Sequence, residues 1–311
     1  MNRDWRSMMD LGLVHFMAWP ELIKDQGPIV ETVERIAQDE FFGVLEVRRS
    51  DNPEIAPALW RLGQISGLAY GVGAQPGLLL GKLSLNDLDE AGRRAAVAEV
   101  KQSVDFAAAV AAPLVACLAG PDPGDADRDR AMDLLAESLV ELCRYAEAKG
   151  GDQPIWISLE QFDRAYDKKS LIGPSEDAAT LAYRVTDTVE NFGLCVDLSH
   201  IPILDESIED TVFTLKSHLI HAHAGSCIKQ QGHASYGDQH PRFGHPAGEV
   251  GAPELKRYIE ALVYIGYFQR EVPTRKPVLT FEVKPMPDEG ETPELIIANT
   301  KRTFLDAWAA L

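Results

Sequence analysis

Eight short stretches of mostly apolar residues recur along the chain and are predicted to form β-strands. Their apolar positions are consecutive rather than alternating, which is typical of parallel strands that are buried on both faces. Each stretch gives way to polar residues or to Gly and Pro, which favour loops. The expected strands cover residues 11–17, 42–47, 67–73, 113–118, 154–159, 193–198, 219–224 and 278–283.

Longer stretches with helical periodicity lie between these strands. In one of them, Ile29, Val33 and Ile36 fall on the same helix face. Helices are expected within residues 28–39, 86–111, 126–149, 174–191, 252–265 and 291–309. This alternation predicts an α/β fold, a single-domain (β/α)8 TIM barrel over residues 1–311. An open doubly wound sheet is the alternative, but the chain has no G-x-G-x-x-G motif.

Composition narrows the functional classes. The 311 residues include 30 Lys and Arg against 48 Asp and Glu, which gives a net charge of −18. Nucleic-acid binding needs a basic surface, so we expect no nucleic-acid partner. No stretch is apolar enough for a membrane span or a signal peptide, and we expect a cytoplasmic protein without a membrane partner. The four scattered cysteines are expected to be free and buried. The sequence is compatible with a homo-oligomer but does not decide the oligomeric state.

Four side chains of metal-ligating type stand at the ends of expected strands: Glu160, Asp197, His223 and Glu282. The carboxyl ends of the strands of a parallel barrel meet at one mouth, so these side chains are predicted to converge there. Three carboxylates and one imidazole suit Mn²⁺, Mg²⁺, Co²⁺ or Zn²⁺ better than a metal that selects thiolates.

The motifs around these residues resemble the xylose isomerase-like TIM barrels, which include sugar isomerases, ketose 3-epimerases, inosose-processing enzymes and AP endonucleases. The similar segments are S-L-E at 158–160, D-L-S-H at 197–200, H-A-H-A-G at 221–225 and F-E-V at 281–283. The resemblance implies that Glu160, Asp197, His223 and Glu282 hold one divalent metal. It also implies that His200 contacts the substrate.

Two features separate the chain from parts of that family. The family's epimerases place an Arg six residues after the strand-seven His, whereas this chain has Lys229. Asp238-Gln239-His240 is similar to the D-x-H of the AP endonucleases, which with His200 would hold a second ion. No His lies between residues 15 and 200, so the three-zinc site of those nucleases is incomplete. We therefore leave two roles open for His200, Asp238 and His240: substrate binding or a second metal site.

Four further residues are candidate substrate contacts: His15, Glu46, Lys229 and Lys284. His15 ends the first expected strand and has a structural hydrogen-bonding role as its alternative. Glu46 has an ion pair with Arg48 or Arg49 as its alternative, and Lys284 could simply neutralise the ligand cluster. His221 shares a strand face with His223 and is expected to be a packed core residue.

Together these residues predict a divalent-metal-dependent isomerase or epimerase. Its partner would be a small-molecule sugar or keto-polyol, and Glu160 and Glu282 would transfer a proton next to the carbonyl. One metal-dependent alternative is a hydrolase or lyase with a second metal site. The other alternative is a sugar-binding barrel without catalysis. The long loops at 160–173 and 225–251 follow two of the ligand strands and are expected to serve the site.

Overall fold

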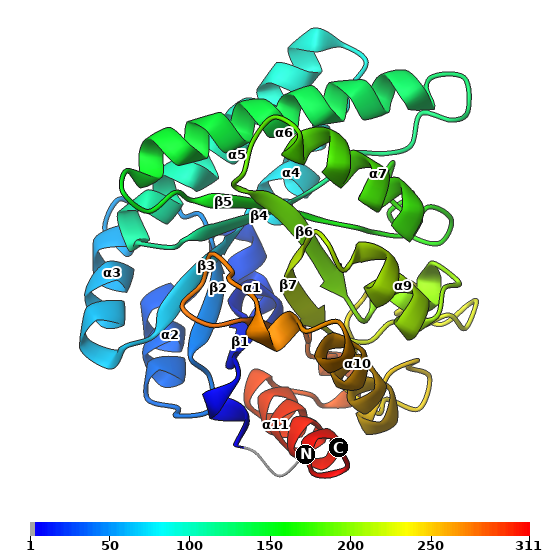
Figure 1. The fold of residues 1–311 in the computed structure, drawn as a ribbon. Helices are drawn as coiled ribbons and strands as arrows, with labels where there is room; N and C mark the ends of the chain where they lie inside the picture. The colour runs from blue at the N-terminus through cyan, green and yellow to red at the C-terminus, as the bar shows by residue number, and fades with distance from the viewer. Residues whose placement is uncertain (1–3) are drawn as a thin grey trace.

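Eight parallel strands close into a barrel in chain order in a computed structural model, which describes residues 4–311 (Figure 1). Strand β1 pairs with both β2 and β8, which closes the barrel. All eight expected strands are present, and the predicted TIM-barrel fold is confirmed. The strands are β1 Asp10–Val14, β2 Val44–Arg48, β3 Ala69–Gly73, β4 Leu114–Leu118, β5 Trp156–Glu160, β6 Phe192–Asp197, β7 Leu219–Ala224 and β8 Val278–Phe281.

Helices surround the barrel (Figure 1). Side-chain caps begin several of them: Asp89 caps α5, Ser207 caps α9 and Thr292 caps α11. The helices are α1 His15–Ala18, α2 Ile29–Ala37, α3 Ile55–Ser66, α4 Gln75–Gly81, α5 Glu90–Val110, α6 Arg128–Gly150, α7 Ser175–Thr186, α8 His200–Ile203, α9 Ile208–Leu215, α10 Ala252–Tyr264 and α11 Pro293–Ala309. The 3-10 turns are η1 Trp5–Ser7, η2 Pro20–Lys24, η3 Tyr267–Gln269 and η4 Pro287–Glu289.

The sequence pattern missed two of the barrel helices and extended the first strand three residues too far. Helix α3 buries only Ile55 and Leu59, so its apolar stripe is short. Helix α9 has only eight residues. Strand β1 ends at Val14, and the chain then turns into α1 instead of continuing as strand to residue 17. That turn directs the His15 side chain toward Thr32 on α2, which bears on the expectation that His15 contacts a substrate.

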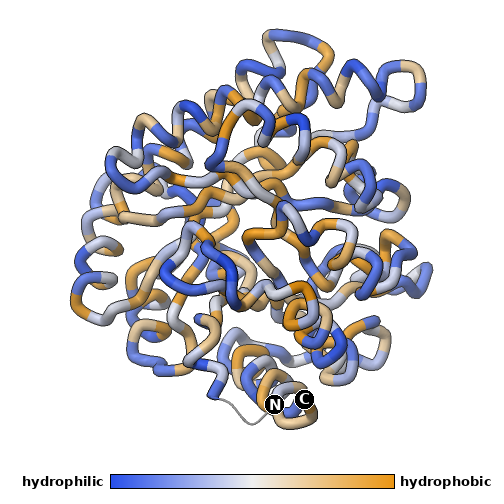
Figure 2. Tube along the Cα trace, in the orientation of Figure 1, coloured by the Kyte–Doolittle hydropathy of each residue, from blue (hydrophilic) through white to orange (hydrophobic). Residues whose placement is uncertain are grey.

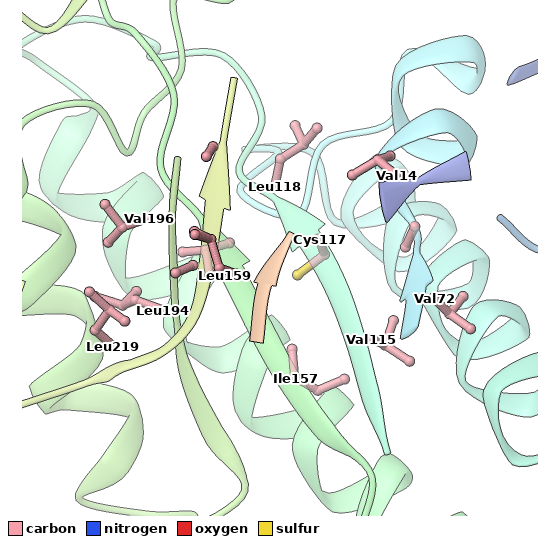
Figure 3. Close-up of a cluster of buried hydrophobic side chains, with 14 of the residues drawn as sticks. Val14, Val72, Val115, Cys117, Leu118, Ile157, Leu159, Leu194, Val196 and Leu219 are labelled. Atoms are coloured by element: carbon pink, nitrogen blue, oxygen red, sulfur yellow. The ribbon is translucent and has the colours of Figure 1, made fainter. Parts of the chain in front are cut away.

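Apolar side chains from the strands and the inner helix faces form a continuous core. Figure 2 shows hydrophobic residues along the strands and hydrophilic residues on the outer loops. Figure 3 shows part of this core, with Val115 and Cys117 of β4 beside their register partners Ile157 and Leu159 of β5. The four cysteines are buried and free, as predicted, and burial raises the pKa of Cys117 to about 12. These thiols are therefore inert packing groups.

Within residues 4–311 no helix has the length and apolar character needed to cross a membrane.

Candidate metal and substrate site

The four predicted ligand residues meet at the carboxyl end of the barrel. Glu160 and Asp197 are the last residues of β5 and β6, His223 lies near the end of β7, and Glu282 directly follows β8. In the β6–β7 register, Asp197 is the direct partner of His223. One ligand atom from each of the four residues lies within 4.8 Å of the others. Strand register therefore brings three carboxylates and one imidazole to a single point.

Two carboxylates in this cluster each have one anchored oxygen and one oxygen without a partner. Gln75 Nε2 donates to Glu160 Oε2 at 2.9 Å, and the Ser199 backbone N–H donates to Asp197 Oδ1 at 2.7 Å. Glu160 Oε1 and Asp197 Oδ2 are buried and accept no hydrogen bond from the described residues. Buried charged oxygens without partners are costly. The donor set fits a divalent cation, which would satisfy both oxygens at once.

The imidazole of His223 is oriented by a buried carboxylate. Its Nε2 lies 3.0 Å from Glu46 Oε2, and a carboxylate only accepts, so Nε2 carries a hydrogen. The other nitrogen, Nδ1, then faces the cluster, 3.1 Å from Glu282 Oε2 and 3.6 Å from Glu160 Oε1. Carboxylate–histidine pairs of this kind hold the ring of metal-ligating histidines. This geometry gives Glu46 a positioning role.

Glu46 also binds His221, whose Nε2 lies 2.8 Å from Glu46 Oε1. Burial alone would raise the pKa of Glu46, but the charges and hydrogen bonds of His221 and His223 hold that pKa well below its usual range. The ion pair with Arg48 or Arg49 is absent, because Arg48 binds backbone carbonyls and Arg49 pairs with Glu99 and Asp51. His221 is a buried, hydrogen-bonded histidine, as predicted.

Glu46→Gln is expected to weaken divalent-metal binding by roughly 10–100-fold, the usual cost of losing a partner of a metal ligand. The amide keeps the size of the side chain but no longer fixes His223 by charge. Metal titration of the apoprotein checks this expectation. Glu21→Gln, on the exposed surface of η2, is the control, and equal metal affinity in both variants would contradict the positioning role.

A second cluster adjoins the first. His240 Nε2 lies 2.9 Å from Asp238 Oδ1 and 3.3 Å from Glu282 Oε1. His200 Nε2 lies 3.2 Å from the same Asp238 oxygen, while its Nδ1 donates to the Gln161 carbonyl at 2.7 Å. Burial lowers the pKa of both histidines, but Asp238 and the other nearby carboxylates together outweigh it. They raise the pKa of His200 to about 10 and that of His240 to about 9. The structure thus brings the three residues of this cluster together.

Lys168 is a cavity residue that the sequence did not reveal. The Asp163 carboxylate accepts the backbone N–H groups of Tyr166, Asp167 and Lys168 at 2.5–2.8 Å, which folds the loop after β5 over the mouth. Lys168 Nζ then lies 3.1 Å from Asp238 Oδ2 and 2.8 Å from Asp167 Oδ2. Burial lowers the pKa of Lys168, but the Asp238 and Asp167 carboxylates outweigh it and raise that pKa, so the ammonium is charged.

Three of the four further substrate candidates do not line the cavity, and neither does His200. Because α1 begins at His15, its ring turns toward α2, where Nε2 contacts Thr32 Oγ1 at 2.7 Å. Burial lowers the pKa of His15 to about 3, so this ring is neutral. Lys229 Nζ binds the Pro202 carbonyl and pairs with Asp205. Lys284 Nζ donates to Gln239 Oε1 at 3.2 Å. These contacts are structural, and substrate contact by His15, Lys229 or Lys284 stays a prediction that the cavity lining does not support.

The two clusters open into one cavity of about 150 Å³ at the barrel mouth. Glu46, Gln75, Glu160, Lys168, His223, Asp238, His240 and Glu282 form its polar lining. Burial raises the pKa of Glu282, although His240 and His223 act in the opposite direction. Burial also raises the pKa of Glu160, but His223, whose Nδ1 lies 3.6 Å from Oε1, outweighs this effect together with His200 and Gln75 and leaves that pKa lowered. Two carboxylates with different environments therefore face the same small space.

Comparison with known proteins agrees with this architecture. No curated protein sequence matches the chain. Among solved structures, D-psicose 3-epimerase from Clostridium cellulolyticum H10 is similar with a TM-score of 0.68 and 18% identity, over 97% of this chain and 99% of that one. The 3-keto-D-glucoside 4-epimerase YcjR from E. coli has a TM-score of 0.67 and 15% identity, over 96% and 99% of the two chains.

A third similar structure is that of the IolI protein with a binding zinc atom, with a TM-score of 0.69 and 16% identity over 96% of this chain and 98% of that one. At these identities the likeness establishes the fold. The sequence itself matches the model of one family, described as xylose isomerase-like TIM barrel, over residues 34–297. The chain belongs to the xylose isomerase-like TIM barrel family.

Proposed function

We propose that the protein is a divalent-metal-dependent isomerase or epimerase that moves a proton next to the carbonyl of a sugar or keto-polyol. One observation carries this proposal. Glu160 and Glu282 share a buried cluster with Asp197 and His223, and both glutamates also line the cavity. An acid–base pair beside a cation site is the arrangement that such proton transfer needs.

Glu160, Asp197, His223 and Glu282 would hold the cation, and their donor atoms suit Mn²⁺, Mg²⁺, Co²⁺ or Zn²⁺. A divalent cation there supplies Lewis acidity that stabilises negative charge developing beside the carbonyl. The partner-free oxygens of Glu160 and Asp197 support this assignment.

The two glutamates would divide the proton transfer between them. They reach the cluster from β5 and from the end of β8, which are separated by β6 and β7 in the barrel. One would remove the carbon-bound proton, and the other would return a proton. Return to the opposite face of the same carbon gives an epimer, and return to the next carbon gives an isomer. Gln75 positions Glu160 by binding the oxygen that does not face the cluster.

The similar structures support this class of reaction, because two of those named above are structures of sugar epimerases and a third contains zinc. Conversion of a panel of ketoses and keto-polyols by the metal-loaded protein tests the proposal. Chromatography with NMR of the products is expected to reveal a C3 or C4 epimer or an aldose isomer. Failure to convert any member, with metal bound, would favour the sugar-binding alternative.

The hydrolase or lyase alternative requires a second cation at His200, Asp238 and His240. The charged ammonium of Lys168 already pairs with Asp238 at 3.1 Å. A lysine and a second metal ion would compete for the same carboxylate and repel each other. We therefore infer that one metal ion is bound per chain, with Lys168 as the cation of the second cluster.

Lys168→Met is expected to create capacity for a second divalent ion. The wild-type protein should bind one Zn²⁺ per chain, and the variant should bind a further equivalent at least about tenfold more tightly than the wild type does, because the nearby positive charge is gone. Zinc titration followed by elemental analysis measures both equivalents. Lys256→Met, which removes a charge from helix α10, is the control. Two tightly bound ions in the wild type would contradict this role of Lys168.

A further inference from the structure

The cavity has a second, apolar half, which the proposed chemistry does not use. This half is built by the segment from β1 through η2, by helix α4 and by Phe162, which lies just after β5. Its side chains include Phe16, Met17, Ile23, Leu79, Leu80 and Phe162. The one polar side chain that α4 contributes is Gln75, and its amide donates to Glu160. Apart from Glu46 on β2, the charged lining residues lie on β5, β7 or the segments that follow β5, β7 and β8, in the part of the barrel order away from β1 to β3.

Helix α4 places two leucines at the rim of this half. Leu78 is buried in the core and anchors the helix. The next two residues, Leu79 and Leu80, line the cavity yet are 47% and 51% exposed. Large apolar side chains beside a polar site are typical of a surface that a ligand covers. The exposed leucines are therefore continuous with the cavity rather than isolated surface residues.

A fully hydroxylated sugar chain would lie poorly against this half. Each hydroxyl group placed there would lose water and find no charged or hydroxyl side chain of the lining as a partner. An unpaired buried hydroxyl costs binding free energy, whereas an apolar group gains from the same burial. The division of the cavity selects a ligand that is polar at one end and apolar at the other.

We infer that the substrate is a keto-sugar that carries an alkyl or aryl substituent, with its carbonyl end at the Glu160–Glu282 cluster and the substituent against Phe16, Leu79 and Leu80. This inference rests on the proposed function, since it uses the same cavity. Beyond the proposed function, it specifies that the end of the substrate remote from the carbonyl is an alkyl or aryl group.

Binding of two matched glycosides to the metal-loaded protein tests it. Methyl and hexyl β-D-glucopyranoside differ only in their alkyl chain, and neither has a carbonyl, so calorimetry reports binding without the reaction. Burial of one methylene is worth roughly fourfold in affinity. If two of the five additional methylenes are buried, hexyl glucoside should bind at least about 15-fold more tightly than methyl glucoside.

The double variant Leu79→Gln/Leu80→Gln should reduce that preference by at least about fourfold, the contribution of one methylene. Leu305→Gln on α11 removes a leucine of similar exposure, 49%, that does not line the cavity, and should leave the preference unchanged. Equal affinity of the wild type for both glycosides overturns the inference. So does a preference that survives the double variant, or one that Leu305→Gln reduces equally.

The oligomeric state of the double variant and the conversion of simple ketoses give two further readouts. Loss of a dimer in the double variant, with its hexyl preference intact, would assign the leucines to an interface between copies and overturn the inference. A protein that converts simple ketoses but lacks any hexyl preference would keep the proposed function and lose only the inference. A protein with the preference but without conversion of any ketose would lose the proposed reaction and keep the apolar half of the site.

Discussion

Asp197→Asn is expected to weaken divalent-metal binding by more than about 100-fold, beyond the 10–100-fold that follows loss of a partner of a metal ligand. The variant preserves the size of the side chain, and its amide oxygen can still accept the Ser199 N–H that binds Oδ1. What it removes is the charge on Oδ2, the buried oxygen without a partner. Elemental analysis of the purified variant and metal titration of its apoprotein measure the loss.

Asp133→Asn is a matched control for this experiment. Asp133 lies on α6, where it pairs with Arg184 on the surface. Its substitution changes the net charge by the same amount and should leave metal content at the wild-type level. Wild-type metal affinity in Asp197→Asn would remove that residue from the metal site and with it the cluster as assigned.

Glu160→Gln and Glu282→Gln are each expected to lower the rate of substrate conversion by about 10²–10⁴-fold, the usual contribution of a positioned acid–base group. An amide of the same shape can neither remove nor return a proton. Because both residues are also assigned as metal ligands, metal content is measured with each rate. A variant that retains metal but loses the reaction identifies an acid–base group, whereas wild-type conversion by either variant excludes that residue from proton transfer.

The convergence of Glu160, Asp197, His223 and Glu282 could be predicted from the sequence because their positions depend on strand geometry. Glu160, Asp197 and His223 each stand at or near the end of an apolar strand, and parallel strands in a barrel bring such ends together. The side-chain alternation of β7 places His221 and His223 on the same face, and His223 is the one nearer the carboxyl end of the strand. Strand positions predict that these side chains converge, and the family resemblance implies that they serve as ligands of one metal ion.

The residues that the sequence missed or misplaced depend on irregular backbone. Lys168 reaches the cavity because Asp163 caps three backbone N–H groups of its loop, a contact without a periodic signal. Gln75 begins the short helix α4, which was not predicted. His15 was expected to continue a strand toward the pocket, but a helical turn at that residue directs its ring to Thr32.

Deuterium incorporation from D₂O is the most direct test of the central claim, proton transfer that depends on a metal held by the cluster. The same protein sample is incubated with a convertible ketose as purified, after chelation and after reloading with Mn²⁺, Co²⁺ or Mg²⁺. Deuterium is expected at the carbon next to the carbonyl with the protein as purified and after reloading with metal, and none is expected after chelation. Exchange that continues unchanged after complete removal of the metal would contradict the central claim.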